Sequence, residues 1–408
     1  QYVDQGVLIP IDEYIEGAPY LKTYLTDDEW KYLTLEGKRY AIAQPRPFQN
    51  WQTVWIRKDW LDNLGLDIPT TVDELAAVAL AFTTQDPDGN GVEDTYGLTG
   101  TAGFRSYMTC YFAPFGADPG HNHVRIENNE VVFDAFSPQA KNALTWWKAQ
   151  IDAGSVDPDW ATNKVAEYVE SISRGRIGAP SSQFQQTRSC GSVACMGPQI
   201  EVATPEAEWI QVPALKGPFG TYAYWRGDLV DVRFWFTLQA KSEPGKMEAI
   251  MRFWDDYMNP DTELYHKAVY GIPGRTYLMD EAGRRTERFS VPELNWLTYW
   301  LVQRRGDEGY FWYYKKEAIF KGEPPALWDR QQFSVSQPGV ENVTPLVLYP
   351  EEWPDLEVYM QEMHMKFATG EEPLEKWDTF INEAMTTYHL RDILDDVTEQ
   401  MKEIGYIR

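Results

Sequence analysis

The residues with the clearest chemical pattern form an acidic loop between positions 86 and 94. Oxygen-bearing groups recur there at every second position, as in an EF-hand calcium loop: Asp86, Asp88, Asn90, the Val92 carbonyl and Asp94. Gly91 stands at the sixth position, where such a loop turns sharply. Alternate groups of a tight loop converge on one point, and an all-oxygen set suits Ca²⁺ better than zinc or copper. The spacing therefore predicts a calcium site.

The loop departs from an EF-hand at the twelfth position, where Gly97 replaces the bidentate glutamate. Residues 95–99, which follow it, are expected to form a strand rather than the second helix of a calcium sensor. Bound calcium would therefore fix a loop and act as a structural cofactor. The alternative is a turn rich in Asp, Asn and Gly that binds no metal.

A second group of residues could bind a sugar. The chain has 17 Trp and 24 Tyr, and flat aromatic rings stack on the C–H faces of sugars while arginine supplies a fork of donors. Three irregular segments combine such groups, and they nominate Arg46, Gln49, Trp51, Trp225, Arg226, Tyr270 and Arg275. Gln183, Phe184 and Arg188 are weaker candidates. A surface loop and a polar-aromatic hairpin are the alternative interpretations of these segments.

The sequence contains no G-x-S-x-G elbow, no H-E-x-x-H pair and no P-loop. His121 and His123 lack a third ligand at a metal-site spacing, which favours a solvated loop. A carbohydrate-active enzyme stays an alternative, because paired carboxylates and aromatic clefts also describe glycosidases. A calcium-dependent adhesion module would require internal repeats, and none is evident.

Composition excludes two further classes. The 408 residues carry a formal net charge of −25, which argues against a nucleic-acid partner. No stretch approaches the roughly 18 consecutive apolar residues of a membrane span. Of the three cysteines, Cys190 and Cys195 form either a small loop disulfide or two free thiols.

The elements that position these residues are short strands alternating with helices, a pattern typical of α/β folds with open sheets. Strands are expected at residues 6–11, 37–43, 54–57, 95–99, 208–213 and 233–238. Helices are expected at residues 58–64, 72–81, 138–153 and 244–257, and over most of the C-terminal part with breaks at Gly370 and Pro373. Thr71 and Glu74 have the spacing of a capping box.

Several blocks in order along the chain carry a family resemblance: Gly6–Asp12, Ile56–Asp62, Pro69–Leu75, the acidic loop with Thr95–Leu98, Val156–Asn163, Tyr270–Gly274 and Phe367–Leu374. Through them the chain resembles the extracellular solute-binding proteins of family 1, in particular its large lipoprotein branch and the alginate-binding periplasmic proteins. The blocks are specific together rather than singly, and they span nearly the whole chain.

The resemblance implies an α/β, two-lobed periplasmic-binding-protein-like fold of type II, with a hinge and an interlobe cleft that closes on ligand. Lobe 1 would comprise residues 1–105, with the calcium loop 86–94, and residues 236–335. Lobe 2 would comprise residues 106–235 and 336–408. Family members begin with a further strand–helix–strand before Gly6, so the N-terminal part of lobe 1 is expected to be missing here. The loop with Arg46, Gln49 and Trp51 would face the cleft.

The implied function is that of the substrate-binding component of an ABC importer, which captures a carbohydrate, most simply an oligosaccharide, and catalyses nothing. Its partners would be the sugar and the permease subunits of the transporter. The protein is expected to be a monomer, either a cell-surface lipoprotein of a Gram-positive bacterium or a periplasmic protein. A lipid anchor would be its sole contact with the membrane.

Overall fold

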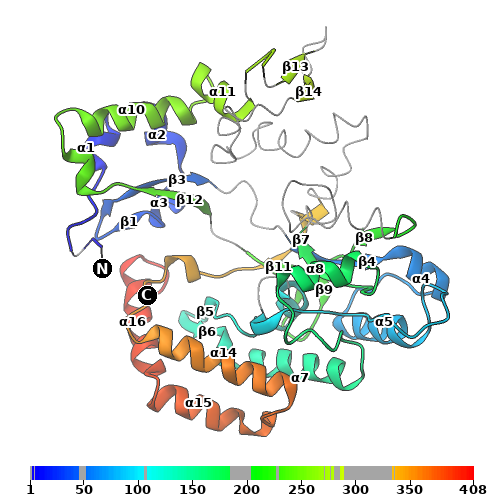
Figure 1. Cartoon of the computed structure of the whole chain (residues 1–408). Helices are drawn as coiled ribbons and strands as arrows, with labels where there is room; N and C mark the ends of the chain where they lie inside the picture. The colour runs from blue at the N-terminus through cyan, green and yellow to red at the C-terminus, as the bar shows by residue number, and fades with distance from the viewer. Residues whose placement is uncertain are drawn as a thin grey trace. The chain divides into compact units, whose positions relative to one another are not determined.

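The computed structural model describes residues 2–3, 5–45, 52–104, 108–183, 204–226, 229–270, 272–275, 277–279, 285–288, 333–334 and 336–408 (Figure 1). The chain divides into two compact units, and it passes from one to the other three times. Unit 1 is Gln1–Gln49 and Gly227–Asp329, and unit 2 is Asn50–Arg226 and Arg330–Arg408.

Unit 1 is built on two antiparallel strands, β3 (Ala41–Pro45) and β12 (Val230–Trp235), which pair from Trp235↔Ala41 to Val230↔Pro45. All five residues of β3 are buried, as expected for a strand covered on both faces. The amphipathic α10 (Lys246–Met258) buries Met247, Met251 and Met258 in the same core. The other elements of unit 1 are α1 (Asp12–Ile15), α2 (Pro19–Tyr24), α3 (Asp27–Lys31), β1 (Thr34–Leu35), β2 (Lys38–Arg39), η4 (Leu238–Lys241), α11 (Glu263–Tyr270), β13 (Tyr277–Met279) and β14 (Arg285–Arg288).

Unit 2 begins with β4 (Gln52–Arg57), which lies between β7 (Ser181–Gln183) and β8 (Trp209–Gln211) in an antiparallel sheet. Beside it lie α4 (Lys58–Leu64) and α5 (Val72–Thr84). Gly65 ends α4 with a φ of +67°, a left-handed conformation that favours glycine. Thr71 and Glu74 form the predicted capping box of α5.

A helical layer completes unit 2. Figure 1 shows α14 (Trp353–Thr369) between α7 (Pro138–Asp152) and α15 (Trp377–Thr386), with α16 (Leu390–Glu403) following α15. Trp146 and Trp147 of α7 are both buried in the core of this unit. The smaller elements are η1 (Ala102–Phe104), α6 (Thr109–Phe112), η2 (Ala113–Phe115), β5 (Val124–Glu127), β6 (Glu130–Phe133), η3 (Asp134–Phe136), α8 (Val165–Ser173), β9 (Leu215–Lys216), β10 (Thr221–Tyr222), β11 (Tyr224–Trp225), β15 (Gly339–Val340), η6 (Thr344–Leu346) and η7 (Leu374–Lys376).

The two units differ from the predicted lobes in where residues 50–105, 227–235 and 330–335 belong. Residues 50–105 pack with unit 2, because Trp60, Leu75 and Phe82 share one hydrophobic core with α7 and α14. Residues 229–235 lie in unit 1, because β12 pairs with β3. The second passage between units therefore precedes β12, whereas the sequence analysis placed it after residue 235.

Two of the expected strands are reduced to isolated bridges. In the expected strand 95–99, Tyr96 bridges Ile177 and Leu98 bridges Val156. Leu8, in the expected strand 6–11, bridges Thr237. Among the described helices, none is long and apolar enough to cross a membrane.

Candidate functional site

The predicted ligand-binding residues fall in different parts of the chain. Arg46, Gln49 and Trp51 lie outside the described residues, as do Phe184 and Arg188. In unit 1, Tyr270 ends α11, and Arg275 is an exposed residue whose backbone N–H donates to the Ile272 carbonyl at 3.1 Å. Gln183 ends β7 in unit 2.

Trp225 and Arg226 stand at the end of β11, where the chain leaves unit 2 for unit 1. β11 runs parallel to β15, with Trp225 opposite Val340, and the Arg226 N–H donates to the Val340 carbonyl at 2.9 Å. β15 can approach because Gly339 lacks a Cβ, which would lie 2.6 Å from the Tyr224 ring. Asn342 Nδ2 then donates to the Arg226 carbonyl at 2.6 Å.

The Arg226 guanidinium is partly open to solvent. Its side chain is 42% exposed, and Nη1 donates to Glu341 Oε1 at 2.7 Å. Such an ion pair is held weakly, because water screens both partners. Arg226 can therefore exchange Glu341 for the hydroxyl or carboxyl groups of a ligand.

Trp225, by contrast, is only 6% exposed. The His123 ring stacks on the indole, with centroids 4.2 Å apart and an interplanar angle of 10°. Ala113 and Val340 pack around it in a small apolar cluster. The imidazole of His123 therefore covers one face of the Trp225 indole and holds the ring in place.

His123 was missed by the sequence analysis, which interpreted it as part of a solvated loop. Its side chain is only 21% exposed, and Nε2 lies 3.3 Å from Asp118 Oδ2. Burial alone would lower the pKa of His123, but the hydrogen bond to Asp118 and the charges of Asp134 and Asp118 outweigh it and raise that pKa. The spacing His121–x–His123 before a strand is the one local sign that the two side chains lie on the same side, where both meet Asp118 Oδ2.

Two buried carboxyl groups support this histidine. Asp134 Oδ1 accepts from the His123 N–H at 2.6 Å, and Oδ2 accepts from the Asp118 N–H at 3.1 Å. Burial, opposed by the charges of His123 and Arg125, raises the pKa of Asp134 to about 7. Asp118 Oδ2 also lies 3.5 Å from His121 Nδ1. The cluster therefore holds protons that can shift near neutral pH.

Arg125, on β5, adds a buried guanidinium to the same neighbourhood. Its side chain is 3% exposed and forms an ion pair with Glu127. Its Cζ lies 4.8 Å from the centre of the Phe219 ring and 6.0 Å from that of Trp225. Aromatic rings, carboxyl groups and guanidinium groups thus meet around Trp225, a mixture that can orient a polar ligand.

The acidic loop has the turned backbone that its sequence predicts, with φ of +68° at Gly89 and +78° at Gly91. Asp86 Oδ2 accepts from the Gly91 N–H at 3.0 Å, and Asn90 Oδ1 accepts from the Val92 N–H at 2.6 Å. Asn63 of α4 anchors the loop by donating to the Pro87 carbonyl at 2.9 Å.

The oxygen groups of this loop are of the kind that Ca²⁺ prefers. Asp86 Oδ1 is buried, and no described residue donates to it. Burial, a side-chain hydrogen bond with Asp86 and the charges of Asp94 and Asp86 raise the pKa of Asp88, the effect expected where carboxylates crowd together without a counter-ion. Within the described residues, no three His, Cys, Asp or Glu side chains converge as a metal site. A cation would therefore also need the Asn90 amide oxygen and the Val92 carbonyl.

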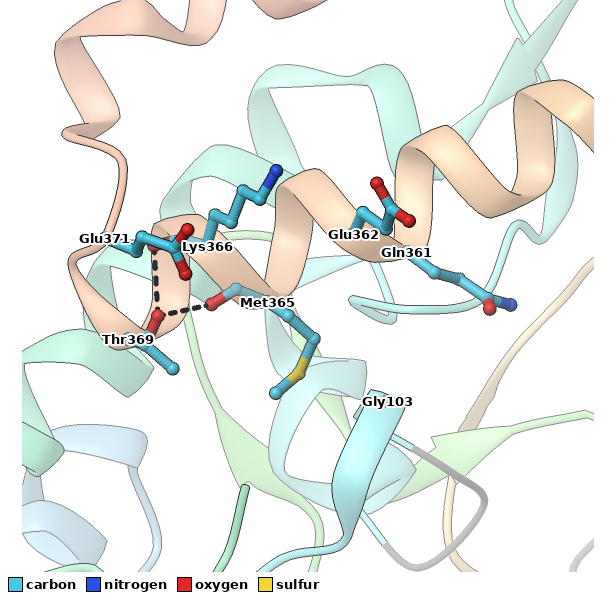
Figure 2. Close-up of a pocket in the computed structure, with 7 residues that line it drawn as sticks. All are labelled: Gly103, Gln361, Glu362, Met365, Lys366, Thr369 and Glu371. Carbon is cyan, nitrogen blue, oxygen red and sulfur yellow. Dashed lines mark hydrogen bonds between the residues drawn. The ribbon is translucent and has the colours of Figure 1, made fainter. Parts of the chain in front are cut away.

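Two surface pockets are lined by other residues. The pocket of about 550 Å³ in unit 2 follows the C-terminal half of α14 (Figure 2), and its lining residues are Gly103, Gln361, Glu362, Met365, Lys366, Thr369 and Glu371. These seven residues include no aromatic ring. The pocket of about 420 Å³ in unit 1 involves Glu13, Tyr14, Gly17, Glu248, Met251 and Arg252. Neither contains a predicted ligand-binding residue.

Residues 1–225 match the family model of the bacterial extracellular solute-binding proteins, and the chain belongs to this family. The family assignment made from the sequence is thereby confirmed. Membership in a family of solute-binding proteins also opposes the enzyme alternative.

Among curated relatives, the chain is 28% identical over 273 residues to the polygalacturonan/rhamnogalacturonan-binding protein YtcQ of Bacillus subtilis, covering 67% of this chain and 52% of that protein. It is 28% identical over 173 residues to the fructooligosaccharide ABC transporter substrate-binding protein FusA of Streptococcus pneumoniae, covering 39% of this chain and 32% of FusA. The chain therefore spans about half the length of YtcQ, and its match to FusA covers about a third of that protein.

Among solved structures, the alginate-binding protein AlgQ2 without calcium ion aligns with a TM-score of 0.71 at 18% identity, over 98% of this chain and 83% of AlgQ2. At this identity the likeness shows the fold alone. It confirms the predicted α/β, two-lobed solute-binding fold. The predicted loss of N-terminal residues from lobe 1 stays a prediction.

Proposed function

We propose that this protein is the substrate-binding component of an ABC importer and that it captures a carbohydrate, specifically an oligosaccharide. The observation that carries the proposal is the family membership of the chain together with the group of aromatic and arginine side chains at the end of β11. A saccharide needs flat apolar surfaces for its ring faces and charged donors or acceptors for its hydroxyl groups. Trp225, Arg226 and the side chains around them combine both kinds of group at one place in unit 2.

The names of the similar proteins support a carbohydrate ligand. YtcQ is named for polygalacturonan and rhamnogalacturonan, FusA for fructooligosaccharides and AlgQ2 for alginate. The three names include both acidic and neutral sugars. The proposal therefore begins with oligosaccharides as a class, and Arg46, Gln49, Trp51, Tyr270 and Arg275 stay candidate contacts with Trp225 and Arg226.

A thermal-shift screen over neutral and uronic-acid oligosaccharides tests the proposal, with isothermal titration calorimetry on each sugar that raises the melting temperature. We expect binding of an intact oligosaccharide at micromolar or lower Kd, without release of reducing ends. Release of reducing sugar from a polysaccharide panel would instead support the enzyme alternative. A melt that no sugar shifts would remove the carbohydrate assignment, and peptides or lipid precursors would replace it.

We further propose that Asp86, Asp88, Asn90, the Val92 carbonyl and Asp94 hold a structural Ca²⁺. The unpartnered Asp86 Oδ1 and the crowded carboxylates support this proposal. Calcium would neutralise the carboxylates and fix the loop beside α4 and α5.

The family is extracellular, and we infer that this chain works outside the cytoplasm with the permease subunits of its transporter. A monomer held at the cell surface by a lipid anchor is the form we propose for a Gram-positive bacterium, and a periplasmic protein is the alternative. Membrane fractionation of the native protein, before and after protease treatment of intact cells, tests the location.

A further inference from the structure

Two buried arginines of unit 2, Arg57 and Arg125, each lie near two aromatic rings but differ in how a carboxylate meets the guanidinium. Arg57 is 3% exposed, with its Cζ 4.5 Å from the Trp60 ring centre and 5.7 Å from that of Trp209. Asp59 closes the Nε–Nη2 edge of this guanidinium with both carboxylate oxygens, and the Nε–Oδ1 distance is 2.8 Å. Nε and Nη2 of Arg57 thus both donate to this carboxylate.

Arg125 also has aromatic neighbours, but its carboxylate partner meets a different part of the guanidinium. It is also 3% exposed, its Cζ lies 4.8 Å from the Phe219 ring centre and 6.0 Å from that of Trp225, and its Nη1 donates to Glu127. Its Nε and Nη2 are buried, and neither donates to any described residue. The edge that Asp59 fills on Arg57 is therefore open on Arg125.

The nearby carboxyl groups do not close this edge. Both oxygens of Asp134 accept backbone N–H groups, those of His123 and Asp118. Asp118 Oδ2 faces the two histidines, and Asp118 Oδ1 is buried without accepting from Arg125 or any other described residue. Glu127 is engaged at Nη1. The indole Nε1 of Trp225 is a further buried donor without an acceptor among the described residues. Buried donors without acceptors destabilise a protein, so these groups require water or a ligand.

We propose that the open Nε–Nη2 edge of Arg125 binds a carboxylate of the ligand and makes the protein selective for acidic sugars. The two parallel N–H groups of a guanidinium match the two oxygens of a carboxylate, and lysine cannot reproduce this geometry. A sugar that carries such a carboxylate is a uronic acid, so we expect the ligand to contain one. This inference rests on the proposed carbohydrate-binding function.

A matched pair of ligands tests the role of Arg125: a short oligogalacturonate and the same oligomer with its carboxyl groups methyl-esterified. We expect the wild type to bind the free acid at least about tenfold more tightly than the ester. Arg125→Gln and Arg125→Lys should weaken binding of the acid by about tenfold or more and change binding of the ester little. The ratio of the two affinities, measured by calorimetry, should therefore approach one.

Arg57→Lys is the matched control, because it alters an arginine of equal burial whose edge is already closed by Asp59. It should lower the melting temperature and leave the acid-to-ester ratio unchanged. If Arg125→Gln does not fold, the ratio in the wild type and in Arg125→Lys still decides the matter.

The outcomes separate the two proposals. A wild type that binds the ester as tightly as the acid, or variants that keep the wild-type ratio, would overturn the role of Arg125 and leave a carbohydrate-binding protein. Selective binding of neutral sugars by the wild type would also overturn the role of Arg125. Failure of the wild type to bind any oligosaccharide would remove both proposals.

Discussion

Arg226 forms an exposed ion pair and also follows the buried Trp225 in the chain. The ion pair predicts a small effect of Arg226 on stability, and its place beside Trp225 predicts a large effect on sugar binding. The pair with Glu341 is open to solvent, so Arg226→Ala should change the free energy of unfolding by about 1 kcal/mol or less. If Arg226 contacts the sugar, the same variant should weaken binding about tenfold or more, because a charged hydrogen bond is lost. Chemical unfolding and calorimetry on one preparation measure both effects.

Arg174→Ala is the control for this variant. Arg174 is also an exposed arginine of unit 2, paired with Glu170 at 2.5 Å. The Arg174→Ala variant should have about the same free energy of unfolding as Arg226→Ala, and it should bind the sugar with the affinity of the wild type. Equal affinities for the two variants would remove Arg226 from the binding site.

His364 predicts how acid affects unit 2. The imidazole is fully buried, accepts from the Gly120 N–H at Nδ1 (3.1 Å), and places Nε2 3.0 Å from the Ala135 carbonyl, so the neutral ring satisfies both contacts. Burial lowers its pKa to about 4, below the value of about 6.5 in an unfolded chain. Its contribution to stability is therefore complete above pH 6.5 and is lost as the pH falls towards 4, by at most about 3 kcal/mol.

His364→Gln should remove that part of the acid sensitivity, since an amide can make both contacts without titrating. Urea unfolding at several pH values between 4 and 8 measures the difference between the variant and the wild type. Asp134 has a raised pKa, so its effect on stability has the opposite pH dependence. Its contribution to the free energy of unfolding is present below pH 3.8 and is lost as the pH rises through about 7. Parallel pH profiles of the two proteins would show that His364 does not titrate as its burial implies.

At the residue scale, the sequence predicted Trp225 and Arg226 because an aromatic ring and a guanidinium follow each other in an irregular segment. It missed His123 and Arg125, which lie near the same indole, and Asp118, which is the partner of His123. Their proximity depends on the pairing of β11 with β15 and on the Val343 N–H that donates to the Val124 carbonyl at 2.7 Å. Such contacts join distant segments, and no local spacing encodes them.

At the scale of elements, local signals were sufficient where the structure is locally determined. The capping box of α5, the glycine end of α4 and the break at Gly370 all follow from short sequence patterns. The passage between units at residue 226 did not follow, because it is set by the long-range pairing of β12 with β3. Residues 95–99 have strand composition, yet they make only single bridges, to Ile177 and Val156.

The acidic loop gives the prediction at this scale. Calcium at about one hundred times its Kd should stabilise the folded state by about 2.7 kcal/mol and raise the melting temperature of unit 2 by a few degrees. EGTA should reverse the increase, and Asp88→Asn should reduce it. Glu93→Gln, a change within the loop outside the ligand positions, should respond to calcium as the wild type does. A melt that neither calcium nor EGTA changes would mean that the loop is a turn without metal.

At the scale of the whole molecule, the two units have separate hydrophobic cores. Ile11, Ile42 and Met251 belong to the core of unit 1, while Trp60, Trp147 and Phe367 belong to that of unit 2. The units are joined by three passages of the chain. Separate cores allow separate unfolding, since a cooperative transition needs contacts that are lost together.

We therefore expect differential scanning calorimetry of the protein without sugar to show two transitions. A ligand held by both lobes, as the family fold implies, binds only while both are folded, so saturating oligosaccharide should raise both transitions and bring them together. Arg226→Ala, titrated to the same fraction bound, should behave as the wild type does, because the coupling depends on occupancy. If sugar raises one transition and leaves the other in place, the ligand is bound by a single unit, and capture between two lobes is wrong for this protein.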